Sequence, residues 1–175
     1  MNYQTIEEVY AANDKIRERL LETIENISDD EANDLPEDEK WTIAQIVEHL
    51  SLVEGGMGRI AAKLLNESKD NGKTSDGRAN VSEDFLKVVE EARHQKLEAP
   101  DRVHPTGEQT IAESIEKLKE SRQRLYALRS LFETVDCSEL KFPHPAFGAM
   151  TAHEWLALVG GHEFRHLQQI KKRLK

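Results

Sequence analysis

Two histidines near the end of the chain, His162 and His166, stand four residues apart, with Glu163 directly after the first. On an α-helix, positions i and i+4 differ by about 40° in azimuth and about 6 Å in height, so both imidazoles project from one face and can bind one metal ion. The five residues match H-E-x-x-H, the zinc-binding pattern of metallopeptidases. The motif predicts a metal site and raises the question of whether the protein is a peptidase.

The rest of the chain does not favour a peptidase. Such an enzyme needs a third ligand, usually a Glu or His downstream of the motif helix, but residues 167–175 contain no Asp, Glu, His or Cys. Peptidases of this kind also commonly bind substrate along a strand edge, and the sequence has no alternating run of useful length for a strand. We therefore expect a third ligand from upstream of the motif.

His49 is the best upstream candidate. On a helix its direction lies within about 40° of Val53 and about 60° of Ile46, at the margin of an apolar stripe, so it can face the protein interior. Together with His162 and His166 it completes a three-histidine metal site. The remaining histidines fit less well, because they fall opposite an apolar face, in proline-bounded loops or in a first helical turn: His94, His104, His144 and His153.

Other interpretations explain these residues less well. Glu91-x-x-His94 and Glu163-x-x-His166 both match the Glu-x-x-His element of di-iron carboxylate bundles, but helical directions do not bring the carboxylates together. A single buried histidine would be explained by hydrogen bonding alone, whereas three together favour a metal, since buried polar groups need partners. Glu163 and His144 are conceivable acid–base groups, although we expect Glu163 to be a solvated helix charge and His144 a loop residue.

The elements that must position these histidines are almost all helical, because apolar residues return at three- and four-residue steps. Thr42 and Ser82 are predicted N-caps, and the two prolines between residues 142 and 148 predict an extended turn. The predicted helices cover residues 4–27, 42–66, a short segment after Ser82, 110–132, and 151 to the C-terminus.

Four long helices of this size predict an all-α four-helix bundle. A long connection at about residues 67–108, with a short accessory helix, separates the second and third helices. This connection is long enough to cross the bundle, so those two helices need not be antiparallel neighbours. With 175 residues, we expect one domain spanning 1–175.

Composition and charge disfavour several classes of function. A formal net charge of −9 and a pI near 5.3 disfavour binding to nucleic acid or to anionic lipid. Cys137 is the single cysteine, so no intrachain disulfide forms. No apolar run approaches the roughly 20 residues of a membrane span, and the first residues lack a signal-peptide core. These features predict a cytoplasmic protein.

Three segments, in this order and over most of the chain, resemble the DinB-like (DinB/YfiT) superfamily. The resemblance implies a four-helix bundle with a divalent metal, often nickel or zinc, held by three histidines near one end, at His49, His162 and His166 here. The long connection is the main departure, an insertion that can reshape the pocket mouth. The segments are Trp41 to Leu50, Phe147-Gly148 with Thr151 to Leu156, and His162 to Ile170.

Some members of that superfamily attach or isomerise substrates through low-molecular-weight thiols such as bacillithiol or mycothiol. By this resemblance we expect a metal-dependent transferase, thiol S-transferase-like, or a hydrolase, acting on a small molecule with nickel or zinc as cofactor. No catalytic side chain is assigned. The alternatives are a non-catalytic metal-binding bundle and a small-molecule-binding bundle. An exposed apolar helix edge would be compatible with a homodimer.

Overall fold

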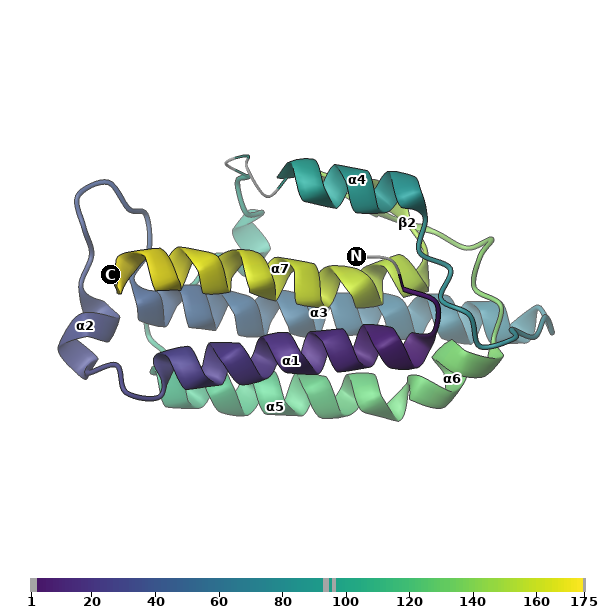
Figure 1. Cartoon of the computed structure of the whole chain (residues 1–175), viewed down its shortest axis with the longest axis horizontal. Helices are drawn as coiled ribbons and strands as arrows, with labels where there is room; N and C mark the ends of the chain where they lie inside the picture. Colours follow the sequence, from purple (N-terminus) through teal and green to yellow (C-terminus); the bar gives the residue numbers. More distant parts are fainter. Residues whose placement is uncertain (1–2, 93–94, 96, 175) are drawn as a thin grey trace.

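The computed structural model describes residues 3–92, 95 and 97–174. Four long helices lie side by side along the molecule (Figure 1): α1 (Ile6–Ile24), α3 (Ile43–Asp70), α5 (Ile111–Ala127) and α7 (Ala152–Arg173). The predicted all-α four-helix bundle is confirmed. Within the described residues, no helix combines the length and the apolar character needed to cross a membrane.

Each long helix begins with the same local device. A threonine N-cap accepts a hydrogen bond from the backbone N–H three residues on, and the Glu or Gln at that position bonds back to the N-cap N–H. This capping box satisfies two backbone groups that a helix start would otherwise leave unpaired. The prediction of Thr42 as an N-cap is confirmed. The four caps are Thr5, Thr42, Thr110 and Thr151.

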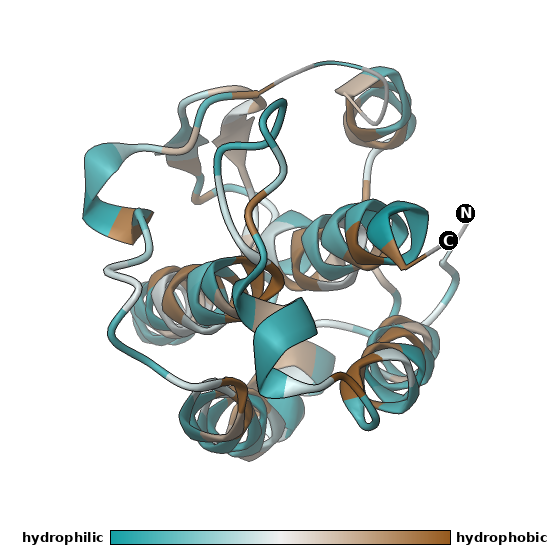
Figure 2. Ribbon diagram, turned by 90° about the vertical axis from the view of Figure 1, so that its left-hand side faces the viewer, coloured by the Kyte–Doolittle hydropathy of each residue, from teal (hydrophilic) through white to brown (hydrophobic). Residues whose placement is uncertain are grey.

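The helices run in two parallel pairs. The beginnings of α3 and α5 share one apolar cluster with the ends of α1 and α7, which fixes α3 parallel to α5 and α1 parallel to α7. The expectation that α3 and α5 need not be antiparallel is therefore confirmed. Figure 2 views the bundle nearly end-on, with apolar residues turned toward the space between the helices. The cluster contains Leu20, Ile24, Ile43, Ile46, Val47, Leu50, Leu118, Leu167 and Ile170.

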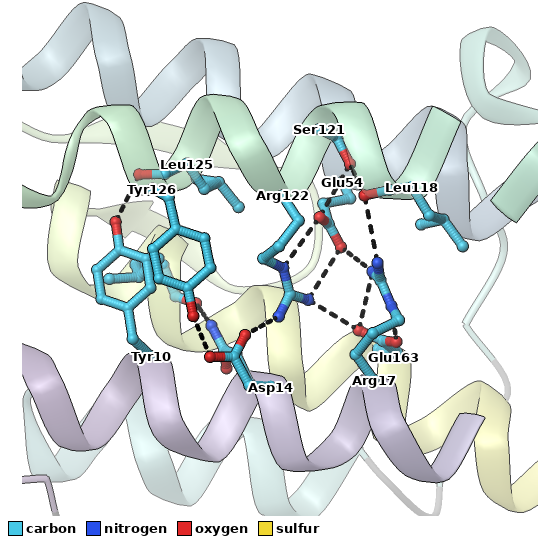
Figure 3. A network of polar contacts seen from close by, with 12 residues as sticks. Tyr10, Asp14, Arg17, Glu54, Leu118, Ser121, Arg122, Leu125, Tyr126 and Glu163 are labelled. Carbon is cyan, nitrogen blue, oxygen red and sulfur yellow. Dashed lines mark hydrogen bonds and ion pairs between the residues drawn. The ribbon is translucent and has the colours of Figure 1, made fainter. Parts of the chain in front are cut away.

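Four buried charged residues lie in the middle of the bundle, one from each long helix: Arg17, Glu54, Arg122 and Glu163 (Figure 3). We call them the charge cluster. A second, larger apolar cluster lies beyond the charge cluster, toward the opposite end of the bundle, around residues such as Leu65 and Trp155. The core is thus two apolar regions separated by ion pairs.

The connection between α3 and α5 is anchored at several places. Its first part runs past the start of α1 and the end of α6 (Arg129–Thr134), where Ala79 N–H donates to Gln4 O. Next comes α4 (Glu83–Ala92), which packs on α7, where Arg165 donates to the carbonyl oxygens of Ala92 and Gln95 at 2.5 and 2.6 Å. Ser82 caps α4 through Phe85 N–H, as predicted.

The last part of the connection contains the 3₁₀ helix η1 (Asp101–Val103) and is held by one carboxylate. Glu48 on α3 is fully buried, and its oxygens accept hydrogen bonds from the N–H groups of Thr106 and Gly107 at 2.8 and 2.9 Å. The Thr106 hydroxyl and the Gln109 amide also donate to it. A buried carboxylate needs several donors to offset its lost hydration. Glu48 therefore fixes residues 103–109 against α3.

The structure differs from the expected helices at three points. The second helix continues to Asp70 instead of ending near residue 66. The expected helix 110–132 is interrupted at Leu128, where a tighter turn separates α5 from α6. The sequence gives no sign of this break, because it has no Gly or Pro there and apolar residues continue at helical spacing. A short helix, α2 (Asp29–Asn33), follows α1.

The prediction that no strand exists is wrong. β1 (Phe142–His144) and β2 (Gly148–Met150) form an antiparallel hairpin, with His144 opposite Gly148. Each strand has three residues, too few for an alternating pattern to be visible in the sequence. Gly148 has φ of +74°, a conformation that glycine adopts without strain.

Gly160 on α7 allows α1 to approach closely. A Cβ added there would overlap Asn13 Oδ1, and Asn13 is buried, donating from Nδ2 to Leu156 O at 2.9 Å. Gly160→Ala should therefore destabilise the protein by about 1–3 kcal/mol in urea unfolding, because overpacking displaces a buried hydrogen-bonded side chain. Gly161→Ala is the matched control, since its Cβ would make ordinary contact with Val89. Equal stability of the two variants would contradict this view of the α1–α7 contact.

Glu48→Gln should loosen the end of the connection without unfolding the bundle. An amide has one accepting oxygen in place of two, so the four donors can no longer all be satisfied. Hydrogen–deuterium exchange of residues 101–110 should become faster, with α1 and α7 unchanged. Glu108→Gln, at an exposed position of the same segment, should leave exchange at the wild-type rate. Unchanged exchange in Glu48→Gln would show that the segment is held by other contacts.

Candidate metal centre

The three predicted histidines come together between α3 and α7. His49 lies on α3, and His162 and His166 lie on successive turns of α7, which packs antiparallel against it. One ring nitrogen from each lies within 4.8 Å of the other two. Among the described residues, no other group of three or more His, Cys, Asp or Glu side chains is placed to hold a metal ion.

The spacing suits a transition-metal ion. His49 Nε2 and His162 Nε2 are 3.3 Å apart. Two ligands of a tetrahedral zinc ion, each about 2.0–2.1 Å from the metal, are separated by roughly 3.3 Å. Three imidazoles whose ligand atoms lie within 4.8 Å of one another suit an ion that prefers nitrogen ligands, and they leave at least one coordination position for water or substrate.

Neighbouring groups fix which nitrogen of two rings is available. His49 Nδ1 is 2.7 Å from Val103 O, so the ring donates from Nδ1 and keeps a lone pair on Nε2. His166 Nδ1 lies 3.0 Å from Gln169 Oε1 in the same way, and Gln169 Nε2 donates to Glu39 Oε2. Metal-binding histidines typically have such a partner on the second nitrogen, which orients the ring.

Burial keeps the imidazoles uncharged. It lowers the pKa of His49 and of His166, the latter to about 3, and it lowers the pKa of His162 well below its usual value. For His162 the neighbouring His166 and His49 act in the same direction, because a second positive charge nearby is unfavourable. Neutral imidazole is the form that coordinates a metal. The three side chains are therefore ready to bind at neutral pH.

The three side chains differ in exposure. His49 and His166 are 3% and 8% exposed, whereas His162 is partly exposed. The Trp41 ring covers His49 at a centroid distance of 4.8 Å, and His104 lies against the same tryptophan at 5.9 Å. His162 is therefore the most exposed of the three candidate ligands.

Glu163 is not the solvated helix charge that the sequence suggested. It is 1% exposed, and it accepts from Arg17 Nε at 2.5 Å and from Arg122 Nη2 at 3.2 Å (Figure 3). Burial raises the pKa of Glu163, whereas the two guanidinium groups lower it. The error arose because its partners come from α1 and α5, so the local pattern of α7 carries no signal for them.

His144 lies in β1, not in a loop. Its ring stacks on Phe147 at 4.6 Å and contacts Trp155 at 5.3 Å, and burial lowers its pKa to about 4. It is outside the group of three, as predicted.

The other histidines have separate roles or positions. His153 is buried and structural: its Nδ1 accepts from Asn80 N–H, and its Nε2 donates to Phe132 O. His104 is exposed, and its Nε2 bonds to Ala99 O. His94 lies outside the described residues, and Glu91 is exposed.

Sequence reasoning missed the groups that orient the ligands. Gln169 had a usable signal, because it stands three residues after His166 on the same helix and so lies beside it. Val103 had none, since it contributes a backbone carbonyl from a connection 54 residues away in the chain. Glu48 had a partial signal, because it is a charged residue next to His49 at a helix position that faces inward.

Comparisons with known proteins agree with this architecture. The uncharacterized protein YuaE of Bacillus subtilis (strain 168) is 28% identical over 159 residues, which cover 89% of this chain and 92% of YuaE. The crystal structure of TT2238, a four-helix bundle protein, superposes with a TM-score of 0.60 at 20% identity, covering 95% of this chain and 98% of that chain. At this identity, the structural likeness shows the fold alone.

A family model adds the evolutionary relationship. It matches residues 12–170, a segment that contains the three histidines, the charge cluster and nearly all of the four long helices. The resemblance seen in the sequence motifs is confirmed by this match, and the chain belongs to the DinB superfamily.

Proposed function

We propose that the protein binds one divalent ion, nickel or zinc, through His49, His162 and His166, and that it is an enzyme acting on a small molecule. The carrying observation is the convergence of the three imidazoles, two of them with Nε2 lone pairs preset by Val103 O and Gln169 Oε1. Imidazole ligands suit zinc and nickel, and a three-ligand shell with an open position is typical of catalytic sites.

When bound, the ion would supply Lewis acidity and lower the pKa of a coordinated thiol or water. The protein's own residues perform the remaining tasks. The three histidines hold the ion, the Val103 carbonyl and Gln169 orient two of the rings, and Trp41 shields His49 from water. Glu163 is bound to two arginines, so it is poorly suited to act as the general base that H-E-x-x-H peptidases require.

We infer that the leading activity is thiol transfer, with the thiol supplied by a small co-substrate. Cys137 is fully buried, and burial raises its pKa to about 11, so the protein has no thiolate of its own to offer. We propose that an external low-molecular-weight thiol takes the coordination position that three imidazole ligands leave free. Hydrolysis of a small molecule by a metal-activated water is the second candidate, and it is favoured by the same open position.

Replacing His49 with Ala should weaken zinc and nickel binding sharply while H-E-x-x-H stays intact. The helical fold should survive, because Ala is a strong helix former. His104→Ala is the matched control, since His104 is close to Trp41 but outside the group of three. Calorimetric titration, with circular dichroism for folding, measures the effect. Equal affinity in wild type and His49→Ala would remove His49 from the site.

Metal binding should weaken as the pH falls, but at a lower pH than for exposed histidines. Protons compete with the ion for the imidazoles, and burial lowers all three pKa values below 6.5. Competition should therefore begin at a lower pH than in a solvent-exposed three-histidine peptide, when zinc affinity is measured between about pH 7.5 and about pH 5. The same pH dependence for the protein and the peptide would contradict neutral buried ligands.

The activity itself is tested by adding a thiol such as bacillithiol and a model electrophile to the nickel- or zinc-loaded protein. We expect conjugation above the uncatalysed rate, abolished by a chelator and by His49→Ala, and no cleavage of an unstructured protein substrate. Metal binding without turnover of thiol or ester substrates would favour a non-catalytic bundle. Proteolysis that a chelator removes would favour the peptidase.

A further inference from the structure

The second nitrogen of His162 has no protein partner among the residues that the structure describes. His49 and His166 each use Nδ1 to bond a neighbouring oxygen. Among the described residues, the recorded polar contact of the His162 ring is Nε2 with His49, and no protein group is hydrogen bonded to its Nδ1. His162 is therefore the least constrained of the three rings, unless something other than protein holds it.

A small internal cavity lies beside this ring. Its volume is about 10 Å³, close to the space that one water molecule requires. Its lining includes polar groups: His162 itself, and three members of the charge cluster, Arg17, Glu54 and Glu163. Apolar side chains, including Val159, make up the rest of the lining. A cavity of this size with several polar partners normally contains an ordered water.

Counting lone pairs identifies the acceptor for that water. A carboxylate has about four acceptor sites. Glu54 uses all of them, because Oε1 accepts from Ser121 and Arg122, and Oε2 accepts from Arg17 and Arg122. Glu163 uses three: Oε1 accepts from Arg17 alone, whereas Oε2 accepts from Arg17 and Arg122. The free site is on Glu163 Oε1.

We propose that one buried water joins His162 Nδ1 to Glu163 Oε1, so that Glu163 is a positioning residue for the metal ligand beside it. In the metal-bound protein the ring donates from Nδ1 to the water, the water donates to the carboxylate, and Nε2 points at the ion. This inference rests on the proposed metal binding. It assigns the glutamate of H-E-x-x-H to orienting a ligand, in place of activating a water.

The test compares two variants that damage the same charge cluster. In Glu163→Gln the amide oxygen takes the place of Oε2, where two arginine N–H groups donate, so an NH₂ group replaces Oε1 and the water loses its acceptor. Zinc affinity, measured by competition with a chromophoric chelator, should fall about tenfold, as for other groups that orient a ligand. Glu54→Gln is the matched control: it has the same two arginine partners and similar burial, so any loss of helix register is common to both variants, and zinc affinity should fall clearly less than in Glu163→Gln.

A spectroscopic signal separates positioning from general damage. In zinc-loaded wild type, nitrogen-15 NMR should show the His162 Nδ1–H as a single, exchange-protected species, and Glu163→Gln should lose that protection. Val159→Ile adds a methyl group to the cavity wall with every charge intact. It should displace the water and weaken zinc binding as Glu163→Gln does, and it decides the matter if Glu163→Gln does not fold.

Two results would overturn the proposal: equal loss of zinc affinity in Glu163→Gln and Glu54→Gln, or wild-type affinity and NMR signal in Val159→Ile. If the wild type binds neither zinc nor nickel, the proposed function fails, and the water bridge is tested separately. A high-resolution crystal structure of the metal-free protein should then show an ordered water between His162 Nδ1 and Glu163 Oε1, and an empty cavity would refute the bridge.

Discussion

The charge cluster is the interaction on which the arrangement of the bundle depends, because each of its four residues comes from a different long helix (Figure 3). Burying four charges costs several kcal/mol of hydration per ion, and ion pairing offsets this cost only with good geometry. Apolar side chains would stabilise the bundle at least as well, but they would allow the helices to slide along one another. Ion pairs at 2.5–3.3 Å do not, so we interpret the cluster as fixing helix register.

Register matters because the candidate metal centre combines two helices. His49 must stand opposite His162 and His166, and a shift of α3 by one residue along its axis, about 1.5 Å, would spoil a ligand distance of a few ångströms. Glu54 stands five residues after His49 on α3, and Glu163 stands directly after His162 on α7. Glu48 then anchors the connection between α3 and α5, and the Val103 carbonyl of that connection orients the His49 ring.

The fold and the three histidines were predictable from local pattern, whereas their surroundings were not. The i, i+4 pair at His162 and His166 is a property of one helix, and the apolar margin that contains His49 is a property of another, so each could be inferred separately. Glu163 was misjudged because its burial depends on partners 41 and 146 residues away. The break at Leu128 and the β1–β2 hairpin were missed because neither leaves a period or a Gly-Pro signal long enough to detect.

The parallel pairing of α1 with α7 also has a kinetic consequence. The first helix of the chain packs on the last, and their ion pair joins residues 146 positions apart. Most helical bundles fold fast because their contacts are local in sequence. Here α1 and α7 must pack together although nearly the whole chain separates them, so we expect folding slower than is usual for an all-α protein. During synthesis, the apolar face of α1 has to wait for α7, and the histidine group is assembled last.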